Sequence, residues 1–388
     1  MKLARLFSPR RRVLQLGLKL LQRISLWGDN HRFKYTYVLL SSFIAITWLI
    51  PKIIFGSGKD GFESFLRNIA EIFFLTENFI ALGCFVLRRR SFERLVDVLE
   101  RIFNRHWPDA LRVEIDAIIQ ELEKASRSYA TYMSTMLVIF VVSPVLFTVM
   151  KIVLWEEAER GDFVLINETQ FYWLDVRRNS VHYCIFTTLC FVASSCSAYI
   201  LTLKGSLFQV IIRYGYRLFE LVTKRIASMA QLDQVDERRA ELREIIQLHQ
   251  MALEYLEHLE STMSFILLNQ TLSCLLVWCL MLFYVSSNFG LDAANVLILF
   301  IVLLVEMYVF CKNGTILSEK AAEVANAIYF YDWYMDPVDL QQKILLIIQQ
   351  AQKPTGITAA RFYYINIQRF GATAQATYSY YLILKNRF

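Results

Sequence analysis

Long runs of apolar residues constrain this chain most, because a helix that crosses a membrane needs about 20 of them. Seven segments fit that requirement, although the last also contains many polar groups: residues 33–55, 62–87, 129–155, 181–203, 262–285, 294–312 and 362–386. Of the 388 residues, 56% are hydrophobic, which is more than a soluble domain of this length needs for its core. The sequence therefore predicts an all-α membrane protein with seven transmembrane helices.

The charged residues around these segments set the expected orientation. Arg88, Arg89 and Arg90 directly follow the second segment, whereas the loop at 156–180 has six acidic residues against three basic ones. Because basic residues concentrate on the cytosolic side of membrane proteins, we expect a cytosolic amino terminus. Asn167 begins an Asn-Glu-Thr sequon in the expected outer loop, so we predict a glycan there.

Amphipathic helices are expected on the cytosolic side. The amino-terminal segment is basic, and Val13, Leu16, Leu20 and Trp27 share one helical face, as in a helix that lies in the membrane interface. Farther along the chain, apolar residues recur at the spacing of a helix-packing seam: Leu242, Ile246, His249, Leu253 and Leu256. We therefore expect the membrane helices to continue into the cytosol and pack there, in an arrangement that suits subunit assembly.

The sequence contains no pattern of catalytic, metal-binding or cofactor-binding residues. Its five histidines are scattered, and its seven cysteines lie inside apolar segments, where small buried side chains are expected. No glycine-rich phosphate loop occurs, and the net charge of +6 comes from residues next to the membrane rather than from a nucleic-acid surface. We therefore expect no enzyme, no metal or cofactor, and no nucleic-acid partner.

Two familiar classes of membrane protein fit the sequence poorly. A G-protein-coupled receptor would place its amino terminus outside, and neither Asp-Arg-Tyr after the third segment nor Asn-Pro-x-x-Tyr in the seventh is present. A secondary transporter would show paired repeats or broken helices in its two halves, and neither is found. A transporter stays as the weaker alternative to a receptor or channel.

Three stretches in the last third of the chain carry a family resemblance. They are LHQMALEYLEHLESTMSFILLNQTLSCLLV, YFYDWYMDPVDLQQKILLIIQQAQKP and TGITAARFYYINIQRFGATAQATYSYYLILKN, in that order. Together they resemble the insect odorant receptor family. The related gustatory receptors usually end in Thr-Tyr, five apolar residues and Gln-Phe. Thr377 and Tyr378 are present here but Gln-Phe is not, which favours the odorant branch.

The resemblance implies a subunit of a tetrameric, ligand-gated, non-selective cation channel in the plasma membrane of an olfactory dendrite. Its partners would be the family's co-receptor subunits, a small volatile odorant and the lipid membrane. A gustatory-like homotetramer is the alternative among channels. The expected organisation is an amphipathic segment at 1–32, spans one to four at 33–203, a cytosolic helical extension at 204–261, spans five and six at 262–312, a cytosolic anchor at 313–361 and a pore-lining span at 362–388.

The resemblance also places the odorant pocket among spans two to six, in the outer half of the membrane. Aromatic and adaptable side chains there suit a small volatile that is bound mainly by shape. The candidate residues are Phe74, Asn78, Ser143, Phe147, Met150, Phe186, Leu280 and Tyr284. Glu71 lies on the same helical face as Phe74, but Arg67 precedes it by four residues and is a candidate ion-pair partner.

The last span has two polar stripes, and periodicity does not choose between them. The family's register favours one as the pore lining: Thr373, Thr377, Tyr381, Leu384 and Lys385. The other stripe, with Gln375, Ser379, Leu382 and Asn386, would then hydrogen-bond to neighbouring helices. Four lysines at position 385 around one pore, about 8 Å apart, would repel by about 2 kcal/mol per neighbouring pair, which favours few copies of this chain per channel.

Overall fold

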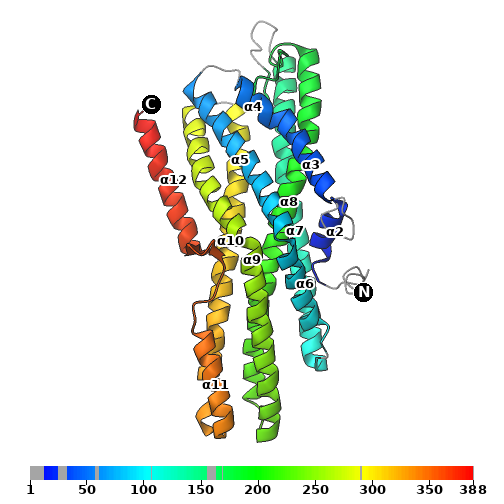
Figure 1. Ribbon diagram of the computed structural model, residues 1–388. Helices are drawn as coiled ribbons and strands as arrows, with labels where there is room; N and C mark the ends of the chain where they lie inside the picture. The colour runs from blue at the N-terminus through cyan, green and yellow to red at the C-terminus, as the bar shows by residue number, and fades with distance from the viewer. Residues whose placement is uncertain are drawn as a thin grey trace.

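The computed structural model describes residues 13–24, 33–56, 61–105, 107–154, 163–167, 169–288 and 291–387. They form long helices that run nearly side by side (Figure 1). The elements are α2 (Gln15–Arg23), α3 (Phe33–Ile44), η1 (Ala45–Leu49), α4 (Ile50–Phe55), α5 (Phe62–Leu87), α6 (Arg89–Phe103), α7 (Asp109–Leu154), α8 (Ser180–Met229), α9 (Val235–Ser287), α10 (Leu291–Tyr329), η2 (Trp333–Met335), α11 (Val338–Ala351), β1 (Thr358–Ala359), β2 (Tyr363–Tyr364) and α12 (Ile367–Arg387).

Six described helical segments are long and apolar enough to cross a membrane, and each overlaps one of the first six predicted spans, although the last four extend well beyond the predicted ends. The second predicted span, 62–87, matches α5 residue for residue. The seventh, α12, is too polar to meet the same criterion, and it lies at the side of the bundle in Figure 1. The all-α membrane fold that the sequence predicts is therefore confirmed.

Several of these helices continue far beyond the length that a membrane requires. The helix α8 has 50 residues and α9 has 53, against about 20 for one crossing. In Figure 1 the first turns of α9, the last turns of α10 and the whole of α11 form one end of the molecule, which we call the anchor end. The helices therefore extend well past one membrane length and pack against one another at the anchor end, and the cytosolic location of that end stays a prediction.

The seam predicted on α9 is present but wider than expected. Leu242 and Leu256 are buried, whereas Ile246 and Leu253 lie at the edge of the core. His249 packs edge-on against Phe219, with 6.2 Å between ring centroids, and burial lowers its pKa to about 4. His249 is therefore a neutral packing residue at physiological pH, and no cluster of potential metal ligands occurs among the described residues.

The amino-terminal helix α2 docks on the bundle with a face that only partly overlaps the predicted one, which includes the buried Val13. Leu18 and Leu21 are buried against the bundle, while Leu16 and Leu20 are only partly covered. The Glu123 carboxylate on α7 accepts a hydrogen bond from the backbone N–H of residue 15 at 2.6 Å, which fixes the start of α2. The helix is therefore held by contacts with α7 and α8. Trp27, part of the predicted face, lies outside the described residues.

A two-stranded hairpin connects the anchor end to α12. Its strands pair antiparallel, with Ala359 opposite Tyr363, so α12 begins five residues later than the predicted span. Glu260 on α9 accepts a hydrogen bond from the Thr358 backbone N–H at 2.8 Å. Thr315 on α10 accepts one from the backbone N–H of Ile367 at 2.9 Å, which fixes the first turn of α12.

The same connection depends on a glycine. The carbonyl oxygen of Ile365 lies 2.1 Å from the position that a Cβ atom at Gly314 would occupy. No side chain fits at that distance, so the backbone before α12 approaches α10 only because residue 314 is glycine.

We predict that Gly314→Ala lowers the stability of the protein by about 1–3 kcal/mol, because the added methyl pushes the hairpin away from α10. Gly371→Ala is the matched control, since nothing lies within 4 Å of its would-be Cβ atom in α12. Melting temperatures of the two variants, followed by size-exclusion chromatography in detergent, provide the measurement. Equal melting temperatures would contradict the close approach at Gly314.

Candidate functional site

A narrow cavity lies among five elements of the membrane bundle. Its walls come from η1, α5, α7, α8 and α10, and it encloses about 30 Å³ of free space, enough for about one water molecule. The lining residues are Trp48, Glu71, Phe74, Leu75, Leu137, Phe140, Val141, Asn167, Ser194, Ser197, Ala198, Leu201 and Leu299. Most of these side chains are apolar or aromatic, with a few hydroxyl and amide groups among them. Such a lining suits a small, poorly hydrated molecule once the side chains move apart.

A buried charge network borders this cavity. Lys52 on α4 pairs with Glu71, and Arg67 Nε lies 2.9 Å from the same carboxylate. Arg67 Nη1 also donates a hydrogen bond to the Tyr284 hydroxyl at 3.1 Å, so the network reaches α9. The Arg67–Glu71 pair expected from the sequence is thus present. Because all these groups are buried, they are stable as charges only while they remain paired.

A second buried network lies one to two turns farther along α5. Lys204 on α8 donates to Gln270 on α9 at 2.7 Å and to both oxygens of Glu77 at 3.2 Å. Glu306 on α10 lies 3.5 Å from the same ammonium, and its other oxygen accepts from Gln270 at 3.3 Å. Two carboxylates and one ammonium thus share a site that is closed to water.

The eight residues predicted to bind ligand are not brought together in one cavity. Phe74 lines the cavity and Tyr284 lies beside it in the Arg67 network. Asn78 lines a separate small space next to Lys204, and Ser143 is hydrogen-bonded to Asn295 at 3.1 Å. The remaining four do not line this cavity. Phe186 and Leu280 are buried between helices, Phe147 is partly buried and Met150 is exposed.

Several cavity residues were missed because they are small or lie outside the predicted pocket helices. Ser194, Ser197 and Ala198 belong to a run of small side chains on α8 that leaves room between helices. The run is visible in the sequence, and small residues allow a gap or a close approach between membrane helices. Trp48 lies in η1, a π-helical turn in the first span that no periodicity argument predicts.

The predicted glycosylation site conflicts with the structure. Asn167 is 4% exposed and lines the cavity. With its amide oriented to satisfy its neighbours, its oxygen accepts a hydrogen bond from Trp48 Nε1 at 3.1 Å. A glycan needs an accessible amide nitrogen, so the folded chain has no room for one at this position. Asn167 is a packing residue of the cavity wall.

The predicted pore stripe of α12 also conflicts with the structure. Thr373 and Thr377 are 5% and 2% exposed because α12 packs this face against α9 and α10 of its own chain. Tyr381 and Leu384 continue the same covered face at the edge of the core. Lys385, also assigned to that stripe, is exposed and lies 5.8 Å from the Tyr381 ring.

The opposite stripe of α12 is the one left uncovered by its own chain. Gln375, Ser379, Leu382 and Asn386 are all exposed, and they include amide and hydroxyl groups that gain nothing from contact with lipid. Figure 1 shows α12 standing apart from the bundle with one side free along its whole length. This polar face is available to contact neighbouring subunits or water.

These features define the class of the protein. A helical membrane bundle holds a small apolar cavity between two buried charge networks, and a polar helix presents an uncovered face beside it. The class is that of a helical membrane protein with several spans. The family model described as 7tm Odorant receptor matches residues 61–378, which is most of the chain. The chain therefore belongs to the odorant receptor family and is not an enzyme.

Curated relatives match over shorter stretches. Odorant receptor Or2 of Anopheles gambiae is 26% identical over 147 residues, which cover 38% of this chain and 39% of the relative. The odorant receptor coreceptor of Aedes aegypti is 27% identical over 81 residues, or 21% of this chain and 17% of that protein. The chain thus spans about two fifths or less of the length of these relatives.

A solved structure matches over nearly the whole chain. The insect olfactory receptor OR5 from Machilis hrabei, determined in complex with eugenol, superposes with a TM-score of 0.78 at 14% identity. The match covers 96% of this chain and 97% of that one. At this level of identity, the likeness establishes the fold.

We predict that Phe74→Ala shifts the potency of an activating odorant by about tenfold, or about 1.4 kcal/mol, because it removes an aromatic wall of the cavity. Phe147→Ala is the matched control, since it removes the same side chain at a position outside the cavity lining. Dose–response curves of odorant-evoked current measure both. A large shift with Phe147→Ala and none with Phe74→Ala would place the binding site elsewhere.

Proposed function

We propose that this chain is an odour-binding subunit of a non-selective cation channel that opens when a small volatile binds among its membrane helices. The observation that carries the proposal is the uncovered polar face of α12. The Ser379 hydroxyl donates to the Gln375 backbone carbonyl at 3.0 Å, but the side-chain amides of Gln375 and Asn386 have no hydrogen bond among the described residues. Lipid would not satisfy these amides. A water-filled path between several copies of α12 satisfies them, which is what a channel of assembled subunits provides.

Membership of the odorant receptor family supports the ligand part of the proposal. The cavity beside Phe74 has the apolar and aromatic lining that a volatile requires. Its free space of about 30 Å³ is too small for such a molecule without movement. We therefore propose that binding opens the cavity by moving Phe74, whose side chain is only partly buried. Binding would then displace helices that the two charge networks connect.

The proposed pore lining is the uncovered stripe, with Gln375 and Ser379 facing the permeation path. The proposed orientation places the amino terminus and the anchor end in the cytosol of a sensory cell, as the basic residues predict. Lys385 lies on the exposed part of α12 in this arrangement. Four copies of its ammonium around a pore would repel one another and the permeating cations. This charge supports a mixed assembly with co-receptor subunits over a tetramer of this chain alone.

We predict that cells expressing this chain together with an odorant receptor coreceptor give fast inward currents when volatiles are applied, without added nucleotide. Cells expressing this chain alone should give none. Patch-clamp recording during a volatile screen makes the measurement, with surface labelling to show that both chains reach the plasma membrane. Currents from this chain alone would overturn the mixed assembly in favour of a homotetramer. Substrate uptake without channel currents would instead favour the transporter alternative.

A further inference from the structure

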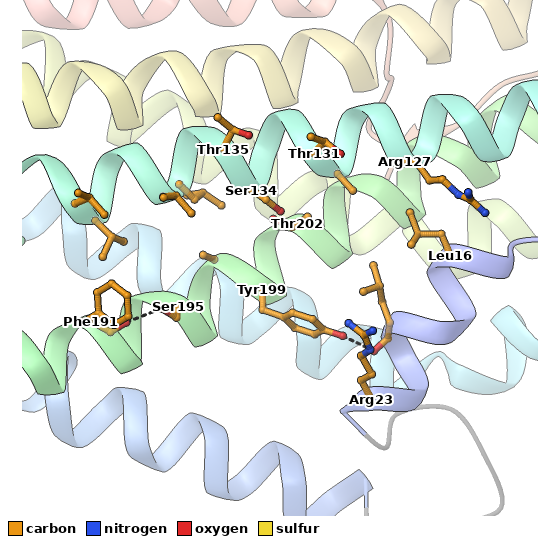
Figure 2. Close-up of a pocket in the computed structure, with 17 residues that line it drawn as sticks. Leu16, Arg23, Arg127, Thr131, Ser134, Thr135, Phe191, Ser195, Tyr199 and Thr202 are labelled. Atoms are coloured by element: carbon orange, nitrogen blue, oxygen red, sulfur yellow. Dashed lines mark hydrogen bonds between the residues drawn. The ribbon is translucent and has the colours of Figure 1, made fainter.

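A groove of about 730 Å³ lies between α7 and α8, and α2 borders one end of it (Figure 2). It is a different space from the narrow cavity, with which it shares the lining residues Leu137, Val141 and Ala198. Its walls away from α2 are mainly apolar, with a few hydroxyl groups such as that of Ser195, and they include Val138 and Phe191, both exposed on the outside of the bundle. An open apolar groove on the membrane-facing side of two transmembrane helices is accessible to lipid.

The end of the groove next to α2 has a strong positive charge. Arg23 comes from α2 and Arg127 from α7, and Figure 2 shows both at this end of the groove. Neither guanidinium has a carboxylate partner among the described residues, although Arg23 lies near the Tyr199 ring system on α8. The Glu123 carboxylate, one turn before Arg127, already accepts two backbone N–H groups of α2. The two positive charges are therefore left without a counterion in the part of the chain that the structure describes.

Polarity changes in order along the groove. On α7, Arg127 is followed at four residues by Thr131, at seven by Ser134 and at eleven by Val138, all on one helical face. Because an α-helix rises about 1.5 Å per residue, the charged, hydroxyl and apolar levels are each roughly 5–6 Å apart. A phospholipid has the same order of groups: a phosphate, then the ester carbonyls, then the acyl chains.

We propose that this groove binds an anionic phospholipid from the leaflet on the anchor side. Its phosphate lies between Arg23 and Arg127, its ester groups face the Thr131 and Ser134 hydroxyls, and its acyl chain follows the apolar wall towards Phe191. Charge complementarity selects an anionic headgroup, because two guanidinium groups near a membrane surface both attract it. The lipid then joins α2 to α7 and α8, in addition to the hydrogen bond that Tyr199 donates to the Leu20 carbonyl at 2.8 Å.

The test uses the full-length protein, purified in detergent in the assembly that it forms in cells. Native mass spectrometry follows the titration of palmitoyl-oleoyl phosphatidylserine and, separately, of the matching phosphatidylcholine. We expect tighter binding of phosphatidylserine, and we expect Arg23→Gln with Arg127→Gln to weaken it by at least tenfold. The matched control is Lys19→Gln with Lys124→Gln, which removes two exposed charges from the same helices outside the groove and should leave binding unchanged.

A second variant tests the acyl part of the site. Val138 is 60% exposed, so Val138→Trp fills the groove without disturbing the core, and it should weaken binding of both lipids. Unchanged phosphatidylserine binding in the double arginine variant would overturn the proposal, as would an equal loss in the lysine control. Equal binding of soluble glycerophosphoserine would show a site for free anions and would also overturn it. Size-exclusion profiles show that each variant is folded.

Discussion

One buried ammonium group holds the membrane bundle together. Lys204 on α8 contacts Glu77 on α5, Gln270 on α9 and Glu306 on α10, so a single side chain links four helices. Charges are costly inside a membrane bundle, and they are retained only where partners satisfy them. Loss of one partner from such a site costs about 3–5 kcal/mol, because the remaining charges stay buried and unpaired. The relative positions of these four helices are therefore strongly constrained.

This constraint also fixes the position of the cavity, because α5 carries residues of both charge networks and of the cavity wall. On α5, Glu71 belongs to the network with Lys52 and Arg67, Phe74 lines the cavity, and Glu77 belongs to the network with Lys204. One helix thus carries a charged layer, a cavity wall and a second charged layer along less than two turns. If the proposed function holds, a ligand that displaces Phe74 pushes on α5 between the two charge networks. Because both networks hold α5 to its neighbours, the neighbouring helices move with it. The displacement would then be passed to α9 and α10, which α12 contacts.

The sequence predicted the fold more successfully than the site. Hydropathy located α5 to the residue, because the bilayer fixes the length of an apolar span. It placed the start of α12 too early, because the short hairpin at Thr358 has no periodic signal. The sequence analysis did not single out Lys204, which directly follows the predicted fourth span, or Glu306, which lies inside the sixth, although ionisable residues at such positions usually face the interior of a bundle.

The candidate ligand residues were chosen because their side chains are aromatic or adaptable. The type of side chain does not show which faces of the helices meet. Phe74 and Phe147 are alike in sequence, yet only Phe74 lines the cavity. The two stripes of α12 presented the same difficulty, because both are polar. Tertiary contacts distinguish them: the stripe that includes Thr373 and Thr377 packs against its own chain, and the other remains uncovered. The burial of Asn167 likewise depended on how the segment between α7 and α8 packs against the bundle.

The most direct test of the channel account is the accessibility of cysteines along α12 while current flows. Gln375→Cys and Ser379→Cys replace residues of the uncovered stripe, whereas Thr373→Cys and Thr377→Cys replace residues of the covered one. A positively charged, membrane-impermeant thiol reagent is applied to the mixed channel during odorant stimulation, with the parent channel as the baseline. The account predicts rapid change of the current at 375 and 379, and none at 373 and 377. Modification confined to 373 and 377, or equal insensitivity at all four positions, would contradict it.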